Sequence, residues 1–402
     1  MQDIQGIFRR VVEFQSELSK IRDLDILLEK ILYEARRFTA ADAGSIYIRE
    51  NDRLKFSQVQ NDTLQSRLPP GKKLFFDTFT IPIDSGSIAG FVAQTGNPLN
   101  LPDVYELSTE YPFSFNRSYD EKASYRTTSM LTLPLKSYRG ECVGVLQLIN
   151  AREDSGRVVP FPPELESVIM HLADAAAAAV ERAKLTRTII LRMNKLAELR
   201  DPLESGPHVH RVAAYSVILY ENWALKKGIP EEEVTRNRDI LRMAAMLHDV
   251  GKVGISDTIL KKPARFTPEE YEIMKTHTLV GARLFGEIQS DFDEAAHVVA
   301  LNHHERWDGN GYPGHVEGSA AGPEAMGPGK RGEEIPLFGR IVAIADVYDA
   351  LSNRRCYKSA WSEEEVLEEI RKEAGKQFDP ELVEVFLENV EALRHARSLY
   401  GD

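Results

Sequence analysis

Strand-like segments occur only before residue 160 of this 402-residue chain, and this uneven distribution limits the possible folds more than any other feature. Short runs rich in β-branched and apolar residues, which are typical of strands, lie at 44–49, 53–58, 81–83, 129–136 and 142–150. Residues 1–40 instead carry apolar side chains at three- and four-residue spacing, as helices do, and strand-like alternation is nearly absent after residue 201. We therefore expect a multidomain chain in which an α+β domain precedes an all-α domain.

A long helical pattern connects the two parts. We place the α+β domain at 1–165, the connecting helix at 166–200 and the all-α domain at 201–402. The connecting helix carries a long apolar stripe, which favours a parallel helical pair and predicts a homodimer. The alternative is that the stripe belongs to the core of its own domain. Its members are Leu172, Ala176, Val180, Leu185, Ile189, Leu191, Met193 and Leu196.

Composition excludes several kinds of function. The net charge of -12 argues against a broad surface for nucleic-acid polymers or membranes, because such surfaces need basic patches. No run approaches the roughly 18 apolar residues of a membrane-spanning helix. The N-terminus lacks an apolar secretory core, and Cys142 and Cys356 lie far apart, so we expect a cytoplasmic protein with reduced thiols. Residues 316–332 are rich in Gly, Ala and Pro and predict a loop.

The ten histidines all lie in the connecting helix or the all-α domain. A single histidine is more often a surface or core residue than a ligand, but several of these accompany acidic residues in apolar surroundings. His248 and Asp249 end an apolar helical segment that we expect Gly251 to cap, and Asp346 lies within another. Burying such groups costs free energy unless something compensates them, and a metal ion does so. Mixed imidazole and carboxylate ligands suit Fe, Mn or Zn, so we expect a multi-metal hydrolase.

Six segments of the all-α part occur in an ordered series: GPHVHRV (206–212), LHDVGKVGI (247–255), MKTHTLVG (274–281), HHERWDGNGYP (303–313), ADVYDALSNRRCYK (345–358) and GKQFDP (375–380). Together they resemble the HD-GYP group of the HD phosphohydrolases. The resemblance implies a helical HD-type domain that hydrolyses cyclic di-GMP to linear pGpG, GMP or both, with two or three transition-metal ions, expected to be iron or manganese. The implied metal ligands are Glu204, His208, His248, Asp249, His277, His303, His304 and Asp346, of which Glu204 matches a carboxylate that only some members use for a third ion.

The same resemblance implies roles in catalysis and substrate binding. Asp249 would bridge two ions, which suits a reaction in which two metals share an attacking water and compensate phosphate charge. Lys252, Arg355 and Lys358 would contact the phosphates of the substrate, and Lys252 would also assist the chemistry. Tyr312 belongs to the loop that shapes the substrate pocket in this family.

The first part resembles a GAF domain in the segment SIAGFVAQTGNPLNLPDV (87–104) and in the paired strand segments SMLTLPL and CVGVLQLIN. The resemblance implies a sensory domain that binds an unknown small ligand or mediates dimerisation, and that regulates the enzyme. Two alternatives to this enzyme remain open. One is a catalytically silent cyclic di-GMP receptor, which the complete set of implied ligands argues against. The other is a phosphodiesterase that prefers another cyclic dinucleotide, such as cyclic GMP-AMP, and the motifs hardly separate these substrates.

Overall fold

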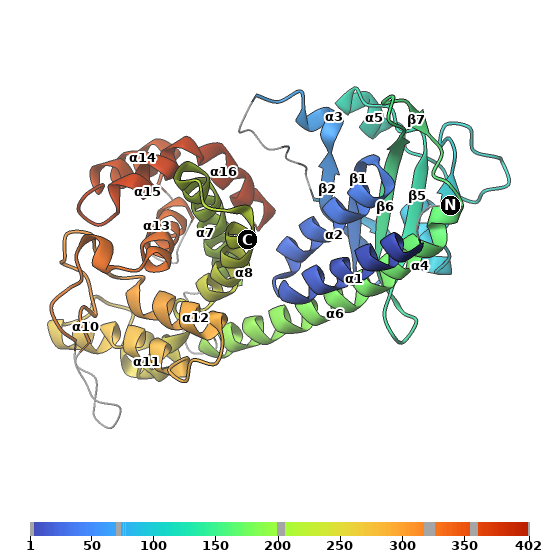
Figure 1. Cartoon of the computed structure of the whole chain (residues 1–402). Coiled ribbons are helices and arrows are strands. Elements are labelled where there is room, and N and C mark those ends of the chain that lie inside the picture. Colours follow the sequence, from blue (N-terminus) through green and yellow to red (C-terminus); the bar gives the residue numbers. More distant parts are fainter. Residues whose placement is uncertain are drawn as a thin grey trace. The chain divides into compact units, whose positions relative to one another are not determined.

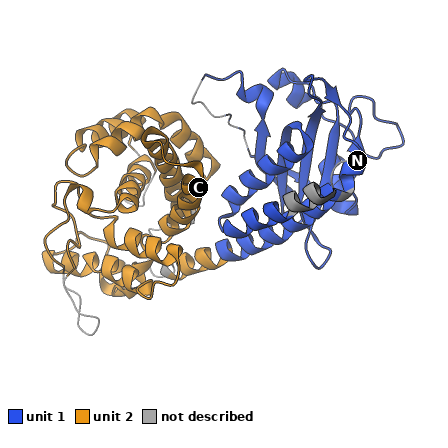
Figure 2. Cartoon of the chain, in the orientation of Figure 1, with its two compact units in different colours: residues 1–187 blue, residues 188–402 orange. Residues whose placement is uncertain are grey.

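The computed structural model describes residues 4–69, 74, 76, 78–198, 206–316, 326–353 and 361–400. The chain divides into two compact units, residues 1–187 and residues 188–402, which are described in turn (Figure 2). The division falls inside the long helix α6 (Glu164–Glu198), which therefore has residues in both units. Every helix in the described ranges is too short or too polar to span a membrane.

The first unit is built around a seven-stranded sheet with the strand order β3-β2-β1-β6-β5-β4, in which β7 also pairs with β6 and every pairing is antiparallel (Figure 1). The five strand segments expected from the sequence are all present. β4 and β7 lie outside those segments, because strands of three and two residues are too short to show a periodic pattern. The strands are β1 (Ala41–Glu50), β2 (Arg53–Asn61), β3 (Thr80–Pro82), β4 (Leu99–Leu101), β5 (Met130–Lys136), β6 (Cys142–Arg152) and β7 (Val158–Val159).

Helices pack on both faces of this sheet. Ile46 and Ile48 of β1 pack with side chains of α2 and α6 on one face, whereas Tyr47 between them packs with Val92 of α4 on the other. Successive side chains of a strand point to opposite faces, so the two apolar clusters form separate layers. The expected α+β architecture of this part is therefore confirmed. Its helices, besides α6, are α1 (Ile4–Lys20), α2 (Leu24–Thr39), α3 (Asp62–Gln65), α4 (Ile88–Thr95) and α5 (Ser118–Ala123).

The apolar stripe of α6 has two different environments. Leu172, Ala176 and Val180 are buried in the core of the first unit, which agrees with the alternative that the stripe serves its own domain. Leu185 and Ile189 are 62% and 50% exposed, and further along the helix Leu196 is 62% exposed. The later part of the stripe therefore has exposed members, although Met193 packs against the core of the second unit.

The second unit consists of helices and loops over the residues that are described, and its all-α class is confirmed. A single core joins α7, α8, α12 and α13, with Tyr215, Leu241, Val299 and Ile344 all fully buried in it. Most of the expected ligands lie at or near the ends of these helices, whereas Asp346 lies in the middle of α13 and His277 begins α11. The elements are α7 (Gly206–Lys227), α8 (Glu231–Met246), η1 (Val250–Gly254), α9 (Asp257–Leu260), α10 (Pro268–Lys275), α11 (His277–Leu284), α12 (Asp291–Asn302), η2 (Gly332–Glu334), α13 (Leu337–Ser352), α14 (Glu363–Lys372), α15 (Pro380–Glu388) and α16 (Val390–Leu399).

Candidate metal centre

Seven of the eight predicted metal ligands lie together in the second unit, and Glu204 lies outside the described residues. They come from the first turn of α7, the turn after α8, the start of α11, the end of α12 and the middle of α13. In each of two groups the potential ligand atoms lie within 4.8 Å of one another. The first group is Asp249, His277, His303 and His304, and the second is His208, His248 and Asp346.

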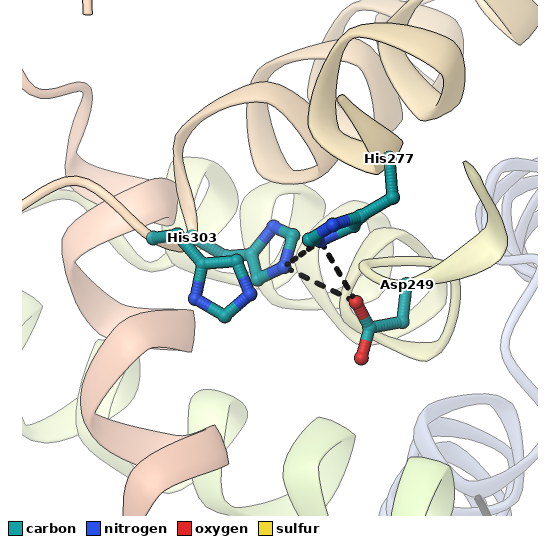
Figure 3. Close-up of side chains that lie close together, drawn as sticks. Asp249, His277 and His303 are labelled. Atoms are coloured by element: carbon teal, nitrogen blue, oxygen red, sulfur yellow. Dashed lines mark hydrogen bonds and ion pairs between the residues drawn. The ribbon is translucent and has the colours of Figure 1, made fainter. Parts of the chain in front are cut away.

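The carboxylate of Asp249 lies between the two groups. Its Oδ1 atom is 3.1 Å from Nε2 of His277 and 3.4 Å from Nε2 of His303 (Figure 3). Its Oδ2 atom is 3.3 Å from Nε2 of His248, which belongs to the second group, and 2.8 Å from Nζ of Lys252. One oxygen therefore faces each group, as a bridging ligand requires.

A close contact between two backbones brings Asp249 to His277. α8 is capped at Leu247, and the chain continues through the 3₁₀ turn η1. A Cβ atom on Gly251 would lie 1.9 Å from the carbonyl oxygen of His277 and 2.3 Å from the backbone nitrogen of Gly281. The prediction that Gly251 caps α8 is therefore wrong: only glycine lets this turn lie directly against α11.

The imidazole rings are oriented by hydrogen bonds from their Nδ1 atoms. In three of them Nδ1 lies near main-chain carbonyl oxygens one turn earlier: His248 to Ala245 at 2.9 Å, His277 to Met274 at 2.8 Å, and His303 to both Val299 and Ala300 at 3.1 Å. A carbonyl oxygen only accepts hydrogen bonds, so each Nδ1 carries the hydrogen. In the neutral ring the Nε2 lone pair is then available to a metal, which is the usual arrangement of metal-binding histidines.

The donor set fits a metal ion. Nε2 of His277 and Nε2 of His303 are 3.4 Å apart, and both face Oδ1 of Asp249. Burial lowers the pKa of His303, although Asp249 opposes the shift, and burial holds the pKa of His304 well below its usual value. Neutral rings present lone pairs to one another and to the carboxylate, which is repulsive unless a cation lies among them. Imidazole and carboxylate donors are those preferred by Fe, Mn or Zn.

Asp249 is the anionic member of this set. Burial alone would raise the pKa of Asp249, but the ammonium group of Lys252 and the ring of His248 outweigh burial and hold the pKa well below its ordinary value. The side chain is therefore a carboxylate at neutral pH. The predicted catalytic pair, Asp249 and Lys252, is in direct contact.

Asp349, which the sequence interpretation missed, holds His208 in place. Oδ2 of Asp349 lies 2.8 Å from Nδ1 of His208, and Nε of Arg211 donates to Oδ1 at 2.7 Å. Burial would raise the pKa of Asp349, but the hydrogen bonds from His208 and Arg211 keep it below its usual value. A signal was available, since Asp349 follows Asp346 by three residues and side chains at this spacing share one face of a helix.

Replacing Asp349 by asparagine should weaken metal binding roughly 10–100-fold, as is typical when a partner that orients a ligand is lost. The loss should affect the group that contains His208, and elemental analysis at limiting metal should therefore show one ion fewer per chain. Asp379→Asn is the matched control, because Asp379 is also a buried carboxylate paired with an arginine, Arg340. Equal metal affinity in the two variants would show that Asp349 does not support the centre.

Glu305 is a second residue whose role the sequence interpretation missed, although it stands in one of the motifs. It holds the loop that follows it in the chain. Its buried carboxylate accepts from the backbone N–H of Gly314 at 2.6 Å and of Lys330 at 3.2 Å. The backbone N–H of Tyr312 also donates to the carbonyl oxygen of His304 at 3.2 Å. These bonds fold the loop back over the residues that carry the ligands. This role can be recognised only when the hydrogen-bond partners of Glu305 in the loop are known, and these lie up to 25 residues away in sequence.

The predicted substrate-binding residues are only partly described. The ring of Tyr312 lies 4.9 Å from the ring of His304, between centroids, at the rim of the centre. Burial, with Tyr271 nearby, raises the pKa of Tyr312, so its phenol stays protonated. Arg355 and Lys358 lie outside the described residues.

Comparison with known proteins identifies both units. A model of the GAF domain matches residues 23–180, and models of the HD domain match residues 207–351 and 327–382. The chain joins a GAF domain to an HD domain. The HD match includes every described candidate ligand, so the expected HD-type domain is confirmed.

Relatives of the chain are named as cyclic dinucleotide phosphodiesterases. A cyclic di-GMP phosphodiesterase of Thermotoga maritima is 42% identical over 195 residues, which are 48% of this chain and 47% of that protein. The cyclic di-GMP phosphodiesterase response regulator RpfG of Xanthomonas campestris is 35% identical over 63% of this chain and 58% of that protein. 3'3'-cGAMP-specific phosphodiesterase 2 of Vibrio cholerae is 36% identical over 52% of this chain and 36% of that protein. The matches therefore span about half or less of most of these relatives.

Proposed function

We propose that this chain is a metal-dependent phosphodiesterase that hydrolyses cyclic di-GMP. The observation that carries the proposal is the carboxylate of Asp249, with one oxygen toward each of two groups of ligands. The names of the relatives from Thermotoga maritima and Xanthomonas campestris support the substrate. The proposal is tested by incubating the metal-loaded protein with cyclic di-GMP and separating pGpG and GMP by chromatography. Absence of both products would contradict it.

Two bound iron or manganese ions would lower the pKa of the attacking water and compensate the charge of the phosphodiester. The HD domain contributes the fixed geometry, because the Nδ1 hydrogen bonds of His248, His277 and His303 prevent their rings from turning. Lys252 places an ammonium group beside Asp249, where it would stabilise negative charge that develops on the phosphate.

Further residues would bind the rest of the substrate. Tyr312 would limit the pocket from the rim, where its ring also lies 5.6 Å from Nζ of Lys275. Arg355 and Lys358 would contact phosphate oxygens, since a guanidinium group binds phosphate in a bidentate way and an ammonium group acts as a point charge.

A second candidate substrate is cyclic GMP-AMP. The observation in its favour is the 36% identity to the cGAMP-specific phosphodiesterase of Vibrio cholerae. The two substrates share the phosphodiester ring and differ in one base, so the metal centre described above would serve either. Rates with the two cyclic dinucleotides decide between them.

We further propose that Glu204 helps to hold a third ion beside His208 and thereby allows a second cleavage. The linear product carries an additional terminal phosphate charge, and holding it would benefit from another cation. Wild-type protein should then convert cyclic di-GMP to GMP, whereas Glu204→Gln should accumulate pGpG and bind one ion fewer. Glu231→Gln, an exposed glutamate at the start of α8, is the control. Equal metal content and equal GMP yield in the Glu204 variant would leave a two-metal enzyme.

The exposed part of the α6 stripe supports a homodimer. Leu185, Ile189 and Leu196 are at least half exposed and follow one another at spacings of four and seven residues, as in a coiled-coil seam. We expect a dimer in solution scattering and a monomer after the double substitution Leu185→Glu and Ile189→Glu. Leu225→Glu, which changes an exposed leucine of α7, should leave the dimer intact. A monomeric wild-type protein would contradict this proposal.

The same helix offers a route by which the GAF domain could regulate the enzyme. Near its end, Nδ2 of the buried Asn194 donates to the carbonyl oxygen of Met246 at 2.8 Å. Met246 is the last residue of α8 and lies two residues before His248. A shift or rotation of α6 would therefore act on the turn that carries His248 and Asp249.

A further inference from the structure

A cavity of about 570 Å³ opens in the GAF domain at one end of the sheet. Its size lies within the range of about 300–1,000 Å³ that is usual for small-molecule sites. The walls come from the end of β1, the last turn of α4, the hairpin between β5 and β6, and α6. The aromatic side chains that pack between the sheet and α4, such as Tyr47 and Phe79, do not line it.

Positive charge gathers in this cavity although the chain as a whole has a net charge of -12. Arg49, Lys136 and Lys184 line it, and Glu141 is the one acidic residue among the lining residues. Burial lowers the pKa of Lys184, and the carboxylates of Glu50 and Glu181, neither of which lines the cavity, oppose this shift. The lining therefore carries three cations against one carboxylate.

Two of the cations are held in place by backbone oxygens. Nζ of Lys184 donates to the carbonyl oxygen of Arg49 at 3.0 Å, and Nε of Arg49 donates to the carbonyl oxygen of Asn51 at 2.8 Å. Neither bond neutralises a charge, because each acceptor is a neutral carbonyl group. The two side chains are thus fixed near one another at the wall of the cavity.

Lys136 is the third cation and is the least compensated. Among the residues that the structure describes, its ammonium group has no hydrogen-bond or ion-pair partner. A Cβ atom on Gly96 would lie 3.1 Å from Cε and 3.3 Å from Nζ of Lys136, so the glycine leaves room for the lysine to lie over the end of α4. Positive charge is favourable at the C-terminus of a helix, which accounts for one cation there but not for three.

We propose that this cavity binds a small phosphate-bearing molecule, with Arg49, Lys136 and Lys184 around the phosphate. A guanidinium group with two ammonium groups is a combination suited to a phosphate dianion. The cavity, at about 570 Å³, is larger than a phosphate ion, and the polar residues Asn51 and Thr95 also line it, so we infer a ligand of nucleotide size. Because Lys184 belongs to α6, the ligand would contact the helix that continues into the HD domain.

Lysine footprinting of the full-length, metal-loaded protein tests this site separately from the metal centre. Acetylation of individual lysines is measured by mass spectrometry in sodium chloride, inorganic phosphate, 5'-AMP or citrate at equal ionic strength. We expect phosphate and 5'-AMP to reduce acetylation of Lys136 and Lys184 at least fivefold relative to chloride. Lys122, an exposed lysine of α5 in the same domain, should react equally in all four solutions.

Variants link the protection to the cavity. Arg49→Gln should abolish the protection of Lys136 by phosphate, whereas Arg53→Gln, on the neighbouring strand and outside the cavity, should retain it. If Arg49→Gln fails to fold, Lys136→Gln serves instead, with the protection of Lys184 as the measurement. Absence of protection by both phosphate and 5'-AMP would overturn the proposal, and so would protection by citrate alone, which would indicate a carboxylate site.

Discussion

Replacing Asp249 by alanine should remove most of the bound metal and nearly all hydrolysis of cyclic di-GMP. The reason is that its two oxygens face different groups of ligands, so one substitution affects both ions. The loss of activity should exceed the roughly 10–100-fold that follows from losing a partner that merely orients a ligand. Elemental analysis and product chromatography on the same preparation measure the two effects.

Asp257→Ala is the control for this experiment, because Asp257 is an exposed carboxylate of α9 in the same domain. It should keep the metal content and the rate of the wild-type protein. Circular dichroism of the Asp249 variant separates loss of metal from loss of the fold. A folded Asp249→Ala protein with the full complement of metal would refute the bridging role.

Replacing Lys252 by glutamine should lower kcat by on the order of 10²–10³, the usual cost of removing one group that stabilises charge in a transition state. Most of the metal should remain, because Lys252 is not among the grouped ligands. Lys252→Arg should recover part of the rate, since it restores the positive charge beside Asp249. The comparison needs kcat and metal content measured for both variants.

The exposed Lys261 offers the matched control, and Lys261→Gln should behave as wild type. Loss of metal in Lys252→Gln, in proportion to the loss of rate, would mean that the lysine acts only by keeping Asp249 ionised. An unchanged kcat in that variant would remove Lys252 from the chemistry altogether.

Much of the fold could be predicted because long elements repeat their apolar pattern several times. β1, β2, β5 and β6 have seven to eleven residues each, and all were visible as strand-like runs. β4 and β7 were not, because two or three residues contain no period. Gly251 was assigned the wrong role since a glycine after a helix looks the same whether it caps that helix or admits another backbone.

The candidate site likewise has a part that could be predicted from the sequence and a part that could not. The ligands stand in short motifs that can be recognised in order, but their division into two groups depends on how five segments meet in space. Asp349 orients His208, and Glu305 holds the loop that follows it. The importance of both residues therefore follows from contacts between segments that are distant in sequence. The environment of the α6 stripe was also decided by tertiary packing, which buries Leu172 and leaves Leu185 exposed.

The reaction proposed for the HD domain is cleavage of cyclic di-GMP with bound transition metal. The most direct measurement compares kcat/KM for cyclic di-GMP and cyclic GMP-AMP in protein that has been stripped with a chelator and then reloaded with iron or manganese. We expect no cleavage without metal and, after reloading, cleavage of cyclic di-GMP at least tenfold more efficient than that of cyclic GMP-AMP. Binding of cyclic di-GMP without cleavage by the reloaded protein would contradict the proposed activity and indicate a silent receptor.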